Sequence, residues 1–246
     1  IHGRDVWKSI LFGSCYEYNI WRIAVEAGAP IDWDGNMPFL GYDKIIFVGD
    51  YVDSFDIPSS VILHNLREII DLKQKLGDRM VLLLGNHDIQ YFVKDQRCSG
   101  HRPELQYDLE QLFNEHLDLF KMAYQHKDHL WTHAGVSQSW LGELKEELYS
   151  PEIRFAALVK DESPETVADE LNLAWQFQLS SLFNCDSDSG GYSTNGGPMW
   201  IRPRRLDADP LRGINQIVGH TTKRSIVQNQ FDTVIHWYID CLEFGD

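Results

Sequence analysis

Two acids, Asp50 and Asp53, follow an apolar run in the stretch "VGDYVDS" (48–54). The run predicts a buried strand, so both carboxylates would lie just beyond the strand's end. A carboxylate in that place often caps the next helix, and for Asp53 a helix beginning near Pro58 provides that alternative. It can also bind or bridge divalent cations. The choice depends on which other side chains reach the same place.

Three further apolar runs end in residues that can bind metal ions. The runs are "RMVLLLGNHD" (79–88), "HLWTHAG" (129–135) and "INQIVGHT" (214–221). They carry Asn86 with His87, then His133, then His220 near their ends. Imidazole nitrogens and amide oxygens suit manganese, iron or zinc. Because ligands of open α/β sheets gather beyond the carboxyl ends of the strands, the four ends predict one shared site.

Each of these residues also has a structural interpretation. Asn86 and His87 could shape a turn, and Asp88 is interpreted mainly as the cap of the next helix. Taken singly, His133 and His220 are typical of hydrogen-bonded core histidines. Their common position after a strand favours the shared site. The other histidines fit no motif and are predicted to be structural: His64, His101, His116, His126, His129 and His236.

Helices must connect these strands. Residues 58–77 combine helical apolar spacing with a serine near the start and a glycine at the end, which predicts a helix between two parallel strands. Further helices are predicted over 102–123, 139–148 and 163–179, the last capped by Ser163. Two segments are predicted to be insertions: 14–43, a short helix with a loop, and 184–198, a mobile surface loop rich in Gly, Ser and Asn.

The composition limits the class of protein. A chain of 246 residues with 43% hydrophobic residues can fold as a single domain over 1–246. No apolar run approaches the length of a membrane span, and no export signal is visible. The four cysteines form no CxxC pair, so a reducing cytoplasm is expected. The net charge of −15 argues against a nucleic-acid partner.

The motifs occur in a fixed order along the chain: "IHG" (1–3), "GDYVD" (49–53), "GNHD" (85–88), "HAG" (133–135) and "GHT" (219–221). This series resembles the calcineurin-like metallophosphoesterases, and within them the phosphoprotein phosphatase branch of bacterial and phage type. The pattern of that branch is GDxHG, GDxVDRG, GNHE or GNHD, HAG or HGG, and GH. The resemblance extends from His2 to His220, leaves the two insertions uncovered, and implies an α/β fold: a four-layer αββα sandwich with two mixed sheets.

The resemblance also implies a dinuclear metal centre. Asp50 would bridge two divalent ions, with manganese expected and iron or zinc as alternatives. His2 would bind the first ion. Asn86, His133 and His220 would join Asp50 on the second. Such a pair of ions can activate water for in-line attack on phosphorus.

A proton donor for the leaving group is implied as well. His87 would protonate the departing alkoxide, and Asp53 would hold its imidazole and favour the charged form. The expected substrate is a phosphorylated protein or small molecule.

The chain departs from the family pattern at three places. The family's Gly-Asp and a preceding strand would come before "IHG", so the natural chain is expected to extend upstream. Ser54 stands where protein phosphatases have a phosphate-binding arginine. Arg202 is the predicted replacement, and Arg4 is the second candidate. Thr222 stands where many phosphodiesterases have a second histidine, which favours the phosphatase branch.

Three functions fit this pattern. The first is hydrolysis of phosphate monoesters, including phosphoserine or phosphothreonine. The second is hydrolysis of dinucleoside polyphosphates such as diadenosine tetraphosphate. The third is a regulatory homologue without turnover. The sequence does not determine the oligomeric state.

Overall fold

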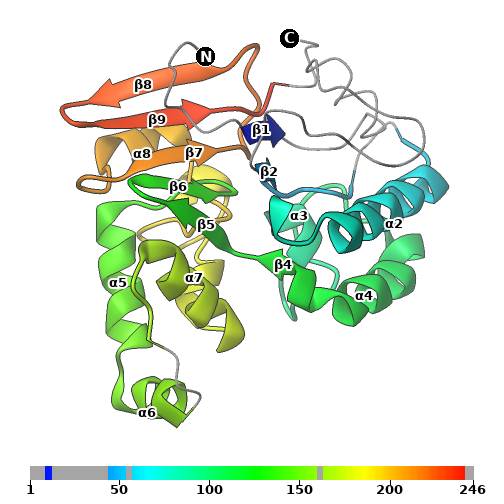
Figure 1. The fold of residues 1–246 in the computed structure, drawn as a ribbon, viewed down its shortest axis with the longest axis horizontal. Helices are drawn as coiled ribbons and strands as arrows, with labels where there is room; N and C mark the ends of the chain where they lie inside the picture. Colours follow the sequence, from blue (N-terminus) through cyan, green and yellow to red (C-terminus); the bar gives the residue numbers. More distant parts are fainter. Residues whose placement is uncertain (1–8, 13–43, 54–56, 160–162, 242–246) are drawn as a thin grey trace.

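Two β-sheets form the centre of the molecule. The structure, a computed structural model, describes residues 9–12, 44–53, 57–159 and 163–241 (Figure 1). The first sheet is parallel in the order β1 (Ser9–Phe12), β2 (Lys44–Phe47), β3 (Met80–Leu83), β4 (Phe120–Lys121). The second has the order β5 (Ala123–His126), β6 (His129–Thr132), β7 (Asn215–Val218), β9 (Val234–Tyr238), β8 (Val227–Phe231). In it β6, β7 and β9 run parallel, while β5 and β8 are antiparallel edge strands.

The apolar runs are continuous because both faces of the first sheet are buried. Successive side chains of a strand point to opposite faces. Ile46 and Val81 belong to a core cluster with Trp131 of the second sheet. Ile45 and Phe47 belong to the larger core cluster that contains helix residues. The four strands predicted to carry the site are all present, each ending close to its motif.

Helix α2 (Ser59–Leu76) connects β2 to β3, which are parallel neighbours, so the predicted strand–helix–strand unit is confirmed. The helix ends at Gly77, whose φ of 53° suits a residue without a Cβ. The expected serine cap is absent: Pro58 occupies the N-cap position and no side chain caps the helix. The short 3₁₀ turn η1 (Gly77–Arg79) then leads into β3.

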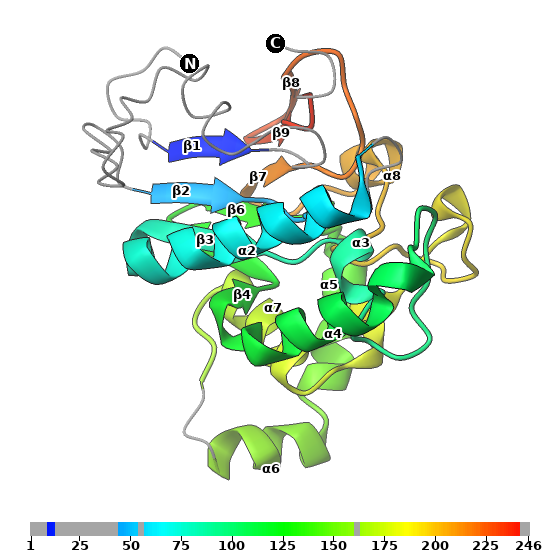
Figure 2. The same cartoon turned by 90° about the vertical axis from the view of Figure 1, so that its right-hand side faces the viewer.

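The helices form the outer layers. Beside the first sheet lie α2, α3 (Asn86–Ile89) and α4 (Gln106–Glu115); beside the second lie α5 (Gln138–Leu148), α7 (Val167–Gln176) and α8 (Pro203–Ala208) (Figures 1 and 2). Helix α6 (Pro151–Val159) follows α5 and lies away from both sheets. Leu206 of α8 packs with Val218 and Tyr238 on the outer face of the second sheet. The αββα layering predicted from the sequence is therefore present.

Two predicted helices are shorter than expected. Within 102–123 only α4 is α-helical; it is preceded by η2 (Pro103–Leu105) and followed by η3 (Leu117–Leu119), β4 and the start of β5. Phe120 leaves the helical pattern because it pairs with Leu82 of β3 and is buried there. Within 163–179 the helix begins at Val167, and its cap is Thr166, not Ser163. Thr166 and Asp169 form a reciprocal capping box, which Ser163 is too far away to make.

The segment 184–198 has a buried anchor. Asp186 is fully buried and accepts hydrogen bonds from the backbone N–H of Asp188 and Ser189, at 3.0 and 3.2 Å, in the turn η5 (Ser187–Ser189). The carbonyl of Pro198 accepts a hydrogen bond from Ala134 N at 2.7 Å, just after β6. The predicted surface loop is thus fixed at its base, while Tyr192 is fully exposed. The other predicted insertion, 14–43, lies outside the described residues.

Among the described residues no helix combines the length and the apolar composition that a bilayer crossing requires.

Candidate metal centre and catalytic site

Four side chains from four strand ends converge on one point. Nε2 of His133 lies 2.9 Å from Oδ1 of Asn86 and 3.3 Å from Oδ2 of Asp50. Nδ1 of His220 lies 3.1 Å from the same Nε2 of His133 and 3.0 Å from Oδ1 of Asn86. Two of these residues follow strands of the first sheet and two follow strands of the second. The site therefore lies at the edge where the two sheets meet.

The donor atoms fit a divalent cation. Nδ1 of His133 lies 2.6 Å from the carbonyl oxygen of Val48, and because a carbonyl can only accept, Nδ1 carries the proton. In the neutral ring Nε2 then presents a lone pair toward the carboxylate and amide oxygens. Adjacent ligands of an octahedral ion at about 2.1 Å are about 3.0 Å apart, close to the separations observed here. A cation bound between Nε2 of His133 and the oxygens of Asp50 and Asn86 would accept the lone pairs that these atoms direct toward one another.

The backbone is strained where the site is built. Asp50, Asp53 and His220 have φ values of 60°, 74° and 62°. This left-handed region costs about 1–2 kcal/mol for a residue with a Cβ. Such outliers persist only where surrounding contacts fix them.

Asp88 supplies those contacts for the turn after β2. Its buried carboxylate accepts hydrogen bonds from the backbone N–H groups of Gly85, Asp50 and Tyr51, at 2.8, 2.8 and 2.7 Å. The interpretation of Asp88 as a cap is confirmed, since Gly85 is the N-cap residue of α3. The same carboxylate also joins the turn after β2 to the turn after β3. A Cβ on Gly85 would lie 2.2 Å from Oδ1 of Asp50, so the close approach of the two turns requires glycine.

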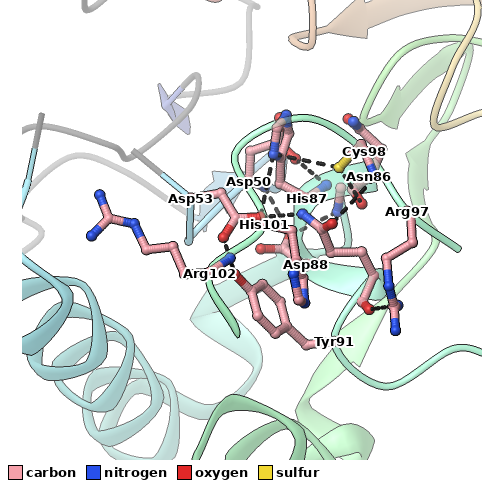
Figure 3. Close-up of polar contacts among 12 residues, drawn as sticks. Asp50, Asp53, Asn86, His87, Asp88, Tyr91, Arg97, Cys98, His101 and Arg102 are labelled. Atoms are coloured by element: carbon pink, nitrogen blue, oxygen red, sulfur yellow. Dashed lines mark hydrogen bonds and ion pairs between the residues drawn. The ribbon is translucent and has the colours of Figure 1, made fainter. Parts of the chain in front are cut away.

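His87 and Asp53 lie next to Asp50 and Asn86 (Figure 3). Nδ1 of His87 is 3.4 Å from Oδ2 of Asp53, and the backbone N–H of His87 donates to Oδ1 of Asp50 at 3.1 Å. Asp53 is buried, and its two carboxylate oxygens accept hydrogen bonds from Gln90 Nε2 and Tyr91 OH. Its alternative role as a cap of α2 is not realised, because that helix has no side-chain cap.

The ionisable side chains of the site shift one another's pKa values. Burial disfavours ionised Asp50, but His133, His87 and His220 outweigh burial and hold the pKa of Asp50 below its usual value. Burial also disfavours charged His87, yet Asp50 and Asp53 raise the pKa of His87 to about 11. Asp50 likewise raises the pKa of His133 against the effect of burial. Burial and the charge of His133 hold the pKa of His220 well below its usual value, so the ring is neutral and one of its two nitrogens carries a lone pair.

Arg202 lies beside the cluster. Its Nη1 donates to Oγ1 of Thr221 at 3.3 Å, one residue after His220, and its charge contributes to the lowered pKa of His220. The next two arginines of "RPRR" point to the segment 184–198 instead. Arg204 pairs with Asp188 at 2.8 Å, and Arg205 pairs with the same carboxylate at 3.1 Å. His2, Arg4 and Ser54, also singled out from the sequence, lie outside the described residues.

Three residues at the site were missed by the sequence analysis. Gln90 and Tyr91 follow His87 by three and four positions, the spacing that returns a helical chain to the same side. This spacing could have predicted that Gln90 and Tyr91 lie near His87. Cys98 gave no such signal, because the chain brings it back through an irregular segment after α3. Its Sγ lies 3.5 Å from Nδ1 of His87.

Comparison with known proteins places this arrangement in a family. The family model for calcineurin-like phosphoesterases matches residues 25–220. The chain belongs to the calcineurin-like phosphoesterase family. Members of this family are metal-dependent phosphoesterases, and the chain is an enzyme of this class with candidate ligands for divalent ions. Its expected resemblance to the family is confirmed.

Solved structures agree on the fold. The cold-active protein tyrosine phosphatase of a psychrophilic Shewanella species aligns with a TM-score of 0.58 at 17% identity, covering 96% of this chain and 73% of that chain. A point mutant of a cold-active protein tyrosine phosphatase aligns with a TM-score of 0.59 at 17% identity, with the same coverage. These likenesses support the two-sheet α/β architecture of this phosphoesterase. No curated protein matches the sequence.

Proposed function

We propose that this phosphoesterase hydrolyses phosphate monoesters, including phosphoserine or phosphothreonine, with two divalent ions that are manganese in the natural protein. The main support is the convergence of Asp50, Asn86, His133 and His220 next to the His87–Asp53 pair. When bound, the ions would supply a Lewis acid for the phosphoryl oxygens and a water nucleophile at neutral pH. Asp50 would be a ligand of both ions, and His2 would be a ligand of the first.

His87 is the proposed general acid. Its raised pKa keeps the imidazole protonated at neutral pH, and Asp53 fixes the direction of the ring through Nδ1. The other ring nitrogen, Nε2, then carries a proton for the leaving oxygen of the substrate. General acids of this kind contribute about 10²–10⁴-fold to turnover, with the larger values for poor leaving groups.

Arg202 is the proposed contact for the substrate phosphate. The support is that its Nη1 donates to Oγ1 of Thr221, the neighbour of His220, whereas Arg204 and Arg205 pair with acidic side chains. A guanidinium can bind two phosphate oxygens at once, which a serine at position 54 cannot do. Arg4 remains the second candidate for this contact.

The test compares three substrates with the manganese-loaded chain: a phosphoserine peptide, p-nitrophenyl phosphate and diadenosine tetraphosphate. Hydrolysis of the first two supports the proposal. Cleavage of the dinucleotide alone would show that the substrate class is the dinucleoside polyphosphates. The Asp50→Asn variant should be inactive and should bind less metal, because a bridging carboxylate is lost. A chain that holds fewer than two metals at saturation and cleaves none of the substrates would instead be a regulatory homologue.

A further inference from the structure

We propose that Asp53, His87 and Cys98 form a separate zinc-binding site, in which bound zinc inhibits the enzyme. Figure 3 shows the three side chains facing one another beside Asp50 and Asn86. These two belong to the four-ligand cluster, that is, Asp50, Asn86, His133 and His220. One ligand atom from each, a carboxylate oxygen, Nδ1 and Sγ, lies within 4.8 Å of the other two. Nothing in the proposed reaction uses the thiol. The effect on turnover rests on the proposed role of His87, but the zinc site itself does not.

The distances match tetrahedral zinc. Zinc binds imidazole nitrogen and carboxylate oxygen at about 2.0–2.2 Å and thiolate sulfur at about 2.3 Å. A tetrahedral ion with these bond lengths separates nitrogen from oxygen by about 3.4 Å and nitrogen from sulfur by about 3.5 Å. The observed separations from Nδ1 of His87 are 3.4 Å to Oδ2 of Asp53 and 3.5 Å to Sγ of Cys98. A water molecule would complete the coordination.

The ligands are held in place by their neighbours. Gln90 donates from Nε2 to Asp53, and its Oε1 accepts the backbone N–H of Cys98 at 3.2 Å. Tyr91 OH donates to the other oxygen of Asp53. One glutamine therefore fixes two of the three ligands, as the residues around established metal sites do. His87 and Cys98 are partly exposed, which leaves the ion a route from solvent.

The donor set favours zinc over the ions of the neighbouring cluster. A thiolate is a soft ligand that selects zinc over manganese or magnesium. The four-ligand cluster contains only nitrogen and oxygen donors. Burial raises the pKa of Cys98, so the thiol is protonated without metal. Binding of zinc would release two protons to solvent, one from the thiol of Cys98 and one from Nδ1 of the His87 imidazolium, and would form a Zn–S and a Zn–N bond.

Zinc in this position would block the proposed acid. An imidazole binds a metal through the lone pair of its neutral form, so Nδ1 cannot hold zinc while the ring is an imidazolium. Zinc-bound His87 therefore lacks the readily transferred proton. The inhibition should be strongest for substrates whose leaving group needs that proton.

The experiment uses cobalt(II) as a spectroscopic probe on the manganese-loaded chain. Thiolate ligation gives a sulfur-to-cobalt charge-transfer band in the near ultraviolet, and the four-ligand cluster cannot produce it. We expect the band in the wild type, its loss in Cys98→Ser, and its disappearance when zinc displaces cobalt. Cys185→Ser is the matched control: its thiol is also partly buried but donates to the carbonyl of Ser189, and the band should persist.

Turnover gives the second readout. Zinc should slow hydrolysis of phenyl phosphate by roughly tenfold or more, and of p-nitrophenyl phosphate by much less, because nitrophenolate leaves without protonation. Cys98→Ser should abolish this difference. Absence of the band in the wild type, or its persistence in Cys98→Ser, would overturn the zinc site. Equal inhibition of both substrates would overturn its action through His87. A thiol-dependent band in a chain that hydrolyses nothing would support the zinc site and contradict only the proposed function.

Discussion

At the scale of single residues, the proposed roles of His87 and its metal-binding neighbours can be separated experimentally. His87→Asn should leave the manganese content unchanged, because the ring lies outside the cluster of Asp50, Asn86, His133 and His220. It should lower turnover of phenyl phosphate by about 10²-fold or more and that of p-nitrophenyl phosphate far less. Steady-state kinetics and metal analysis measure both effects. His64→Asn, on the exposed face of α2, is the control. Equal losses for both substrates would remove His87 from the role of acid.

Asp88 offers a second residue-scale prediction. Asp88→Asn replaces one accepting oxygen by an NH₂ group opposite backbone donors, so at least one buried N–H loses its partner. Each such loss costs about 1–3 kcal/mol. Urea unfolding should show this decrease, and metal affinity should fall because the turn that carries Asp50 is released. Asp71→Asn on the exposed face of α2 should change neither quantity. Unchanged metal affinity in Asp88→Asn would show that Asp50 is positioned without it.

The sequence predicted the convergence of Asp50, Asn86, His133 and His220 because each follows a strand, and strand ends of an α/β fold meet. It did not predict the contact of Cys98 with His87. That contact depends on the path of an irregular segment, and such paths are set by tertiary hydrogen bonds such as the one from Cys98 N to Gln90. Neither periodicity nor residue type encodes them.

At the scale of elements, replacement of glycine by alanine should have opposite effects on stability after a strand and within a helix. Gly85→Ala should destabilise the fold and weaken metal binding, because its Cβ would overlap Oδ1 of Asp50. Gly142→Ala lies inside α5 with open space around it and should stabilise the protein by about 1 kcal/mol. Denaturant unfolding of the two variants measures both effects. Similar changes in both variants would contradict the proposed close packing of the two turns.

The stabilisation that the junction between α5 and η4 (Ser180–Phe183) provides should depend on pH. Glu147 accepts hydrogen bonds from the backbone N–H and the hydroxyl of both Ser180 and Ser181. Burial opposes its ionisation, but these hydrogen bonds outweigh burial and lower the pKa of Glu147. A lowered folded-state pKa means that the stabilisation is complete above the unfolded value of about 4.3 and is lost as the pH falls through the folded value.

Glu147→Gln should therefore lower the Tm at neutral pH, and the difference from wild type should shrink as the pH falls below about 4. Thermal unfolding monitored by circular dichroism at several pH values measures this. Glu146→Gln, the exposed neighbour on the same helix, should show no such dependence. A Tm difference that stays constant with pH would contradict the role of the carboxylate charge.

Boundaries of elements were harder to predict than their existence. The helix expected over 102–123 shortened to α4 because the burial of Phe120 beside β3 outweighs local helical spacing. Strands β8 and β9 were not predicted at all. Half-buried side chains alternate with exposed ones in β8, which is a weak signal in a polar stretch such as "VQNQF". Strand β8 pairs with β9, and β9 pairs with β7, so the place of both in the sheet depends on β7.

At the scale of the whole molecule, removal of metal should affect stability as well as activity. Ions that bind only the folded state stabilise it by about 2.7 kcal/mol at a hundredfold excess over Kd. Treatment with a chelator should abolish hydrolysis and lower the Tm, and manganese should restore both. Scanning calorimetry of the wild type and of Asp50→Asn tests this. The variant should show little response to chelator, and a full response there would place the stabilising ion elsewhere.

The ligand set takes two members from each sheet, and Asn86 and His220 are 134 positions apart along the chain. An ion held there would act as a cross-link that closes a very long loop of polypeptide. Closing such a loop restricts the unfolded ensemble, and the entropy involved grows only slowly with loop length. In physical terms the cation would add a further link between two halves of the backbone that already meet at this edge through apolar contacts and the hydrogen bond from His133 Nδ1 to the carbonyl of Val48.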